Sequence, residues 1–162
     1  MRAVLQRVTS ARVMIDGIEH SRIGLGWLAL VGVEDADGSE DVEWLSHKLV
    51  ELRVFEVGEE HSEQSALPEP ARPREQSVGE IGGDILLVSQ FTLFASTRKG
   101  TRPSWHRAAR PPIAIPLYEA LHRRLSELLG RPVPTGVFGA HMQLELTNDG
   151  PVTLWLDSKV RE

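Results

Sequence analysis

The sequence contains no cysteine among its 162 residues, so disulfide bonds, thiolate catalysis and cysteine-ligated zinc or iron–sulfur sites are excluded. It also lacks a hydrophobic run long enough to cross a bilayer. Its first ten residues, MRAVLQRVTS, do not contain the long apolar segment of a signal peptide. We therefore expect a cytoplasmic protein with no membrane partner.

The sequence motifs of common nucleotide, zinc and serine hydrolase sites are absent as well. No G-x-x-x-x-G-K-[ST], G-x-G-x-x-G, H-E-x-x-H or G-x-S-x-G pattern occurs in a suitable context. The six histidines show no ligand spacing on a shared element, and the carboxylates lie mainly in a polar loop and on helix faces. We expect neither a metal ion nor a cofactor.

Apolar periodicity predicts an α+β fold, a single domain spanning 1–162 with a barrel-like β core covered by two main helices. One helix begins near Asp37 or Ser39 and runs to Leu52; the other has Pro116 in its first turn and Gly130 as its C-cap. The expected strands are 3–8, 11–16, 27–33, 84–94, 137–139, 142–146 and 152–156.

Residues 57–80 lose this periodicity and are rich in Glu, Ser, Pro and Gly. Such a composition cannot bury enough apolar surface to offset the entropy of ordering. We expect a mobile surface loop between the first helix and the strand at 84–94.

Two polar residues interrupt the apolar run ILLVSQFTLF. The period of two in a strand places Gln90 and Thr92 on the same face, with Ser89 and Phe91 on the other. Buried polar side chains cost stability unless their hydrogen bonds are satisfied. The pair therefore indicates either an internal hydrogen-bond network or the lining of a site.

A basic window lies in this otherwise acidic chain, whose formal net charge is -5. No acidic residue occurs from Phe91 to Tyr118, where five cations accompany Trp105 and His106. The cations are Arg98, Lys99, Arg102, Arg107 and Arg110. The window is either a solvated charged loop or a local anion-binding surface.

The run NDGP at 148–151 separates the apolar runs MQLEL and VTLWL. Asn, Asp and Gly favour a turn, and the Pro that follows removes a strand hydrogen-bond donor. Local sequence therefore predicts a turn whose Gly150-Pro151 bond could also be cis.

Four motifs in order carry a resemblance to a known family: SQFTL at 89–93, KGTRPSW at 99–105, FGAHM at 138–142 and NDGPVT at 148–153. Together they resemble the D-aminoacyl-tRNA deacylases over nearly the whole chain. The resemblance implies hydrolysis of D-aminoacyl-tRNA, and of glycyl-tRNA mischarged on tRNA(Ala), with L-aminoacyl-tRNA spared. It also implies a homodimer that takes the aminoacyl-tRNA 3′ end as its substrate and has no DNA partner.

The resemblance also implies roles for single residues. Ser89, Gln90, Phe91 and Thr92 would form the catalytic pocket, with the Phe91 backbone N–H donating to the scissile ester. Gly150 and Pro151, joined by a cis bond, would enter the partner's pocket and exclude an L side chain. Arg98, Lys99 and Arg102 would hold tRNA phosphates, with Arg2 and Arg7 adding to that surface.

Several alternatives stay open at this level. Thr92 could be a nucleophile, or water could attack with help from the RNA 2′-OH. No base that could activate Thr92 lies near it in the sequence, which disfavours the nucleophile mechanism. The rival classes are an L-serine-removing editing domain of threonyl-tRNA synthetase, an inactive tRNA-end binding module and a structural β-rich dimer. The family's usual Lys-Met-Asn segment is missing here, and Trp105 stands where Phe is commoner.

Overall fold

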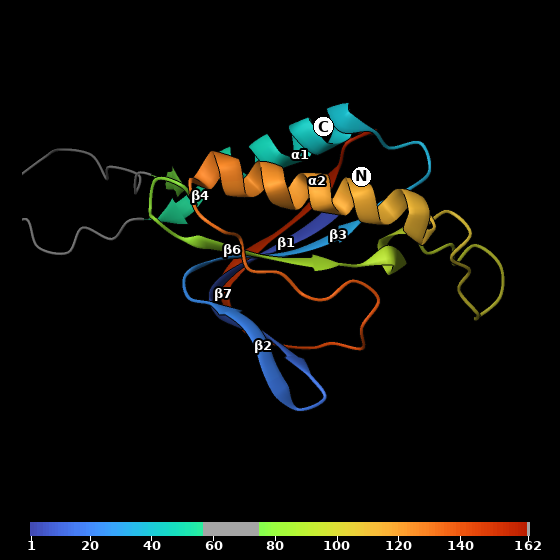
Figure 1. The fold of residues 1–162 in the computed structure, drawn as a ribbon, viewed down its shortest axis with the longest axis horizontal. Coiled ribbons are helices and arrows are strands. Elements are labelled where there is room, and N and C mark those ends of the chain that lie inside the picture. The colour runs from blue at the N-terminus through green and yellow to red at the C-terminus, as the bar shows by residue number, and fades with distance from the viewer. Residues whose placement is uncertain (57–74, 162) are drawn as a thin grey trace, which may run out of the picture.

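The computed structural model describes residues 1–56 and 75–161. Figure 1 shows two helices lying over one face of a curled sheet, which confirms the expected α+β fold. The elements are β1 (Arg2–Ile15), β2 (Ile18–Ile23), β3 (Gly26–Gly32), α1 (Ser39–Glu51), β4 (Arg53–Glu56), β5 (Glu75–Ser77), β6 (Asp84–Ser89), the 3-10 helix η1 (Phe91–Phe94), α2 (Pro111–Leu129) and β7 (Gln143–Asp157).

Strand β1 organises the sheet. One of its edges pairs with β7 along almost its whole length; the other pairs first with β3, up to Val8, and then with β2, from Ala11. The prediction of two separate strands here is wrong. Thr9 and Ser10, which separate the two predicted strands, are exposed and mark the place where β1 exchanges β3 for β2. A turn at Asp16 and Gly17, both with positive φ, then leads into β2.

Strand β6 runs parallel to β3 and is buried on both faces, as its apolar sequence predicts. It lies at the end of the β2-β1-β3-β6 path. The segment after α2 covers its outer edge: the Leu87 N–H donates to the Pro134 carbonyl at 2.9 Å and the Leu87 carbonyl accepts from Gly136 at 3.0 Å. The strand also ends at Ser89, because the chain turns into η1 two residues later.

Strand β7 is a single long strand that replaces the two predicted at 142–146 and 152–156. The NDGP run does not form a hairpin turn. It forms a wide bulge inside β7, since pairing to β1 skips from Asn148 to Thr153. The predicted strand at 137–139 is wrong as well, because these residues form a turn before β7.

Helix α1 begins at Ser39, but its N-cap is Gly38 and not Asp37 or Ser39; Asp41 accepts a 2.9 Å hydrogen bond from the Gly38 N–H. Helix α2 begins at Pro111, five residues before the predicted Pro116, which lies inside the helix. Prolines suit the first turn because its N–H groups have no intrahelical partner. Gly130, at φ 67°, ends α2 as predicted. Neither described helix is long and apolar enough to span a membrane.

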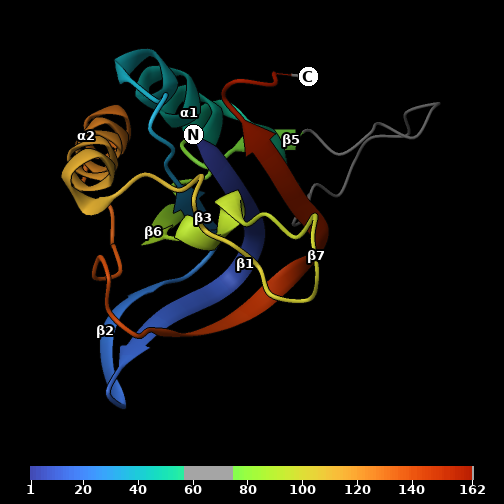
Figure 2. The ribbon, with the colours of Figure 1, turned by 90° about the vertical axis from the view of Figure 1, so that its right-hand side faces the viewer.

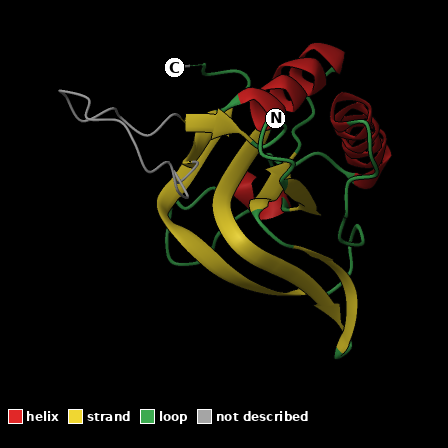
Figure 3. Ribbon diagram, turned by 90° about the vertical axis from the view of Figure 1, so that its left-hand side faces the viewer, coloured by secondary structure: helices red, strands yellow, loops and turns green. Residues whose placement is uncertain are grey.

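Two apolar clusters fill the fold. The larger lies between the sheet and the helices and includes Leu5, Trp27, Leu45 and Leu121. The smaller lies around Val13 and includes residues of β1, β2, β3 and β6, the strands that curl in Figure 3. Strand β1 contributes to both clusters, Ala3 and Leu5 to the larger and Val8 and Val13 to the smaller.

The segment 57–80, predicted as a mobile loop, lies mainly outside the described residues. Its final part is described and is not structureless. Strand β5 pairs antiparallel with β4, with Phe55 opposite Gln76. For these last residues the prediction of a loop is wrong.

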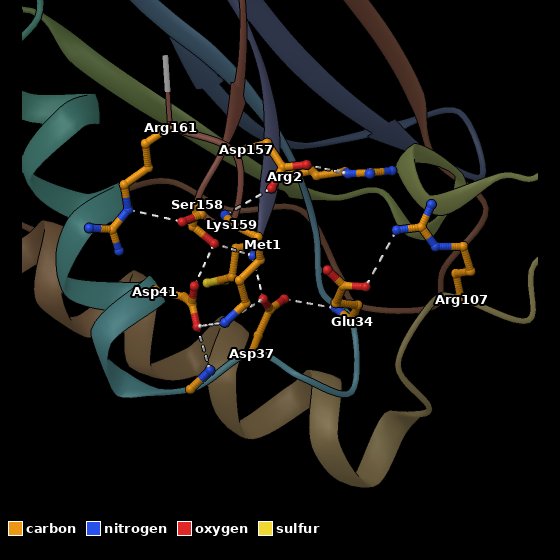
Figure 4. A network of polar contacts seen from close by, with 11 residues as sticks. Met1, Arg2, Glu34, Asp37, Asp41, Arg107, Asp157, Ser158, Lys159 and Arg161 are labelled. Atoms are coloured by element: carbon orange, nitrogen blue, oxygen red, sulfur yellow. Dashed lines mark hydrogen bonds and ion pairs between the residues drawn. The ribbon is translucent and has the colours of Figure 1, made fainter.

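A polar network joins both ends of the described chain to the start of α1 (Figure 4). The α-ammonium of Met1 is buried and donates to Asp37 and to Ser158. Ser158 in turn donates to Asp41 at 2.6 Å, and Lys159 donates to the other oxygen of Asp41 at 2.6 Å. Burial opposes ionisation of Asp41, but these hydrogen bonds outweigh it and lower its pKa to about 2.

Candidate active site

The site begins where β6 leaves the sheet. Gln90 still donates its N–H to the Val31 carbonyl at 2.7 Å, and η1 starts at the next residue. Gly32 of β3 allows this turn to pack closely, because a Cβ there would lie 2.9 Å from the Gln90 carbonyl oxygen and 3.1 Å from the Phe94 ring. The glycine therefore determines how closely η1 approaches the sheet.

The side chains of Gln90 and Thr92 meet, but the prediction that they share one face of a strand is wrong. They do not share a strand face, since Thr92 lies in η1. The tight turn folds Thr92 back, so that the Gln90 amide Nε2 donates to the Thr92 hydroxyl. The contact supplies a partner for two half-buried polar groups at the edge of the core.

A cavity of about 300 Å³ opens beside this pair, between the ends of β3 and β6, helix α2 and the segment before β7. Ser89, Gln90 and Phe91 line it, whereas Thr92 does not. The remaining walls are largely apolar and include Tyr118 and Phe138, whose rings pack edge to face at 6.0 Å. The result is an apolar pocket with a few polar groups at one end, as is usual for small-ligand sites.

Tyr118 contributes structure to this pocket rather than a base. Its hydroxyl donates to the Leu87 carbonyl at 2.8 Å, which ties α2 to β6. Burial raises the pKa of Tyr118 well above its usual range. The phenol therefore stays protonated at neutral pH.

An exposed aromatic pair stands at the rim of the pocket. Phe91 is 55% exposed and Trp105 is 42% exposed, and their rings pack edge to face at 5.5 Å. Backbone hydrogen bonds between Ser96 and Ser104, of 2.9 and 3.0 Å, close the loop between them. These contacts hold the basic loop beside the pocket.

The structure places Arg98, Lys99 and Arg102 together on this exposed loop. Other cations of the neighbourhood have structural contacts. Arg107 lies 3.6 Å from Glu34, and Arg2 forms a 2.8 Å hydrogen bond with Asp157. The basic window is therefore only partly available to an external anion.

Gly150 and Pro151 lie exposed on the bulge of β7, and the peptide bond between them is cis. Arg7 of β1 anchors this bulge from beneath: its Nε lies 3.1 Å from the Asp149 carbonyl oxygen and 2.9 Å from a carboxylate oxygen of the same residue. The guanidinium also donates to the Val54 carbonyl. Arg7 is 8% exposed, so its predicted place on an RNA-binding surface is wrong.

The two predicted halves of the site do not meet within one chain. Neither Gly150 nor Pro151 lines the cavity beside Gln90. Figure 2 shows the bend of β7 on one side of β1 and helix α2, which walls the cavity, on the other.

Sequence reasoning missed two features of the site. Residues 138–142 line the cavity, but the FGAHM motif was given no role. The second is Arg7, which supports the bulge. Its burial could have been predicted, because the period of two places Arg7 on the same inward face as Ala3 and Leu5. A charged side chain on that face needs partners.

Solved structures with this architecture are known. One named "c-Myc DNA Unwinding Element Binding Protein" matches with a TM-score of 0.83 and 35% identity, covering 97% of this chain and 98% of that chain. A second, named as a probable eukaryotic D-amino acid tRNA deacylase, matches with a TM-score of 0.73 and 19% identity, covering 96% and 97%. The second likeness, at this identity, concerns the fold alone.

Sequence comparison identifies the family. The family model described as D-Tyr-tRNA(Tyr) deacylase matches residues 4–157. A D-aminoacyl-tRNA deacylase of Bacteroides thetaiotaomicron is 49% identical over 162 residues, which is 100% of both chains. The chain belongs to the D-Tyr-tRNA(Tyr) deacylase family.

Proposed function

We propose that this chain is a cytoplasmic D-aminoacyl-tRNA deacylase, a hydrolase that cleaves the ester between a D-amino acid and the 3′ end of tRNA. The observation that carries the proposal is the pocket lined by Ser89, Gln90 and Phe91, in a member of the deacylase family. Its volume of about 300 Å³ suits a single amino acid side chain or base. Free D-amino acid and intact tRNA are the products.

Hydrolysis of an ester requires few catalytic groups from the protein, because an ester has a good leaving group. A positioned water and donors for the developing oxyanion are sufficient. Phe91 is the first residue of η1, where backbone N–H groups are not used by the helix itself, so its N–H is suited to donate to the ester carbonyl. Ser89 and Gln90 add polar groups at the same end of the pocket.

Attack by water, assisted by the RNA 2′-OH, fits these groups better than attack by Thr92. The Thr92 hydroxyl accepts a hydrogen bond from Gln90, an amide that cannot act as a base. His141 lines the pocket, but no hydrogen bond joins its described side chain to Thr92. Thr92 then orients Gln90 and is not itself acylated.

We further propose that the enzyme works as a homodimer in which Gly150 and Pro151 of one chain complete the pocket of the other. Their exposure, their support by Arg7 and their distance from their own pocket favour this arrangement. Backbone groups at this position would collide with an L side chain but leave room for a D side chain or a hydrogen atom. Glycyl-tRNA mischarged on tRNA(Ala) would then also be hydrolysed.

Arg98, Lys99 and Arg102 are proposed to hold phosphates of the acceptor end. Such contacts give affinity that falls with rising salt and carries little sequence information. Because the cations lie on the loop held against Phe91 by Trp105, the bound strand would be directed toward the pocket.

Incubation of the purified protein with D-tyrosyl-tRNA, followed by separation of free tyrosine from tRNA, tests the activity. We expect catalytic release of D-tyrosine and no release of serine from L-seryl-tRNA. Binding without release would indicate an inactive tRNA-end module, and release of L-serine would indicate an editing domain. Duplex DNA is the control ligand, because one similar structure is named for DNA binding.

A further inference from the structure

A groove of about 380 Å³ lies between α1 and the C-terminal end of β7, apart from the pocket beside Gln90. It is lined by Trp44 of α1 and Trp155 of β7, and we call it the Trp44–Trp155 groove. Trp155 is 53% exposed, although it is among the largest side chains of the protein. Val160 lines the same groove and is 64% exposed, so the groove carries an exposed apolar patch, and such patches mark places where a partner binds.

Three cations share this groove, and they lie against the aromatic rings. The Arg161 guanidinium is 5.2 Å from the centroid of Trp44, and the Lys48 Nζ is 6.0 Å from the same centroid. The guanidinium of Arg2 is 5.5 Å from the Trp155 ring. These distances fall within the range of cation–π attraction, which arranges positive charge and flat apolar surface side by side.

The groove carries an excess of positive charge on a protein whose net charge is -5. Asp157 is the carboxylate among its described lining residues, and it is paired with Arg2 at 2.8 Å (Figure 4). Lys48 and Arg161 add two further charges to the walls. An anionic partner with flat rings complements this combination.

Arg2 connects the groove to the proposed active site. Its Nη1 donates to the Leu93 carbonyl at 3.1 Å, and its guanidinium lies 4.5 Å from the Phe94 ring. Both residues belong to η1, the turn that also contains Phe91 and Thr92. Figure 2 shows the end of β7 beside α1, where the groove lies.

We propose that the Trp44–Trp155 groove binds unpaired nucleotides of the tRNA strand that leads to the 3′-terminal adenosine. Bases stack on Trp155, and phosphates lie near Lys48 and Arg161. Unpaired bases expose faces that stack on aromatic side chains, whereas a duplex keeps its bases stacked on one another. The proposal rests on the proposed function, because it takes the substrate to be charged tRNA.

Binding of uncharged tRNA with an intact 3′ end, measured over a range of salt concentrations, tests the ionic part. The double variant Lys48→Gln, Arg161→Gln is compared with the charge-matched control Arg22→Gln, Arg123→Gln, which lies outside the groove. We expect the groove variant to bind about fivefold more weakly, with a salt slope shallower by about 1.4, since each phosphate contact on a single strand contributes ~0.7. The control should match the parent in both quantities.

The stacking part is tested by Trp155→Leu, which keeps an apolar side chain but removes the flat ring. We expect weaker tRNA binding at an unchanged salt slope, because stacking releases no counterions. Equal affinity of the parent, the groove double variant and Trp155→Leu would overturn the proposal. It would also be overturned if these variants changed the sedimentation of the protein without changing tRNA affinity, since the groove would then be a contact between copies.

Turnover separates this proposal from the proposed function. In the groove variants the KM for D-tyrosyl-tRNA should rise while kcat stays near that of the parent, because no groove side chain lines the pocket. If the parent protein binds tRNA through the groove but releases no D-tyrosine, the proposed activity fails and the groove assignment stands. A fall in kcat at unchanged KM would contradict the groove assignment.

Discussion

Arg7 contacts both the backbone and the side chain of Asp149. Its guanidinium Nε lies 3.1 Å from the Asp149 carbonyl oxygen and 2.9 Å from a carboxylate oxygen of the same residue. The two residues belong to neighbouring strands, β1 and β7, at the point where their pairing is interrupted. Arg7 thus fills the space opposite residues 149–152 and fixes the direction in which the bulge projects. We expect this buried charge to position the exposed Gly150.

Substitution of Arg7 by Met tests this role. We expect the D-tyrosyl-tRNA hydrolysis rate to fall more than tenfold, while stability falls by about 1–3 kcal/mol because the Val54 carbonyl loses its partner. Single-turnover rates and urea unfolding measure the two effects. Arg12→Met is the matched control, since Arg12 joins the same two strands through Glu145 but is partly exposed and far from the bulge. Equal rate losses in both variants would contradict a positioning role for Arg7.

Thr92→Ala distinguishes the two mechanisms. If Thr92 only orients Gln90, we expect activity within about tenfold of the parent, since the water and the oxyanion donor remain. Loss of a nucleophile would instead reduce kcat by about 10³-fold or more. Trapping of an acyl-enzyme by rapid acid quench and mass spectrometry provides a second reading, and an adduct on Thr92 would rule out the water mechanism.

Gly32→Ala tests the packing of η1 on β3. The added Cβ would lie 2.9 Å from the Gln90 carbonyl oxygen, so the turn must move. We expect a loss of about 1–3 kcal/mol in stability and a loss of deacylation activity, because Gln90 and Phe91 shift together. Gly24→Ala is the control, as a Cβ there meets no atom within 4 Å. A fully active and stable Gly32→Ala protein would show that the turn can be displaced without cost.

The network at the start of α1 makes stability depend on pH in acid. The pKa of Asp41 is about 2 in the folded protein and near 4 when unfolded, so the ionised form is favoured by folding. Its contribution of about 2 kcal/mol is therefore complete above pH 4 and is lost as the pH falls toward 2. Urea unfolding of the parent and of Asp41→Asn from pH 7 to pH 2 measures this contribution to the free energy of unfolding. The stability difference between the two proteins should shrink across this window, and a constant difference would contradict the prediction.

Sequence periodicity was sufficient to predict both helices, although not the start of α2 at Pro111, and to predict the strands whose pairing and burial stay the same along their length. The apolar stripe of α1 and the end of α2 at Gly130 follow from local chemistry. Periodicity failed where one strand changes partner or bulges: β1 at Thr9 and Ser10, and β7 at Gly150, were both predicted to break. In each case pairing with a neighbour distant in sequence outweighs the local preference for a turn.

In the candidate site, too, local spacing alone did not predict contacts between segments that are distant in sequence. Period two predicted a shared strand face for Gln90 and Thr92, whereas a 3-10 turn joins them, and this turn depends on the absence of a side chain at Gly32, on another strand. The role of Arg7 depends on the long-range pairing of β1 with β7. Such contacts between distant segments cannot be obtained from periodicity alone.

The ratio of hydrolysis rates for D-tyrosyl-tRNA and L-tyrosyl-tRNA, measured on the same tRNA under single-turnover conditions, tests the central claim most directly. The two substrates have the same charge, the same RNA and the same ester, so only the fit of the side chain against the pocket differs between them. The account predicts rapid release of D-tyrosine and release of L-tyrosine no faster than without protein. Equal rates for the two substrates would contradict it.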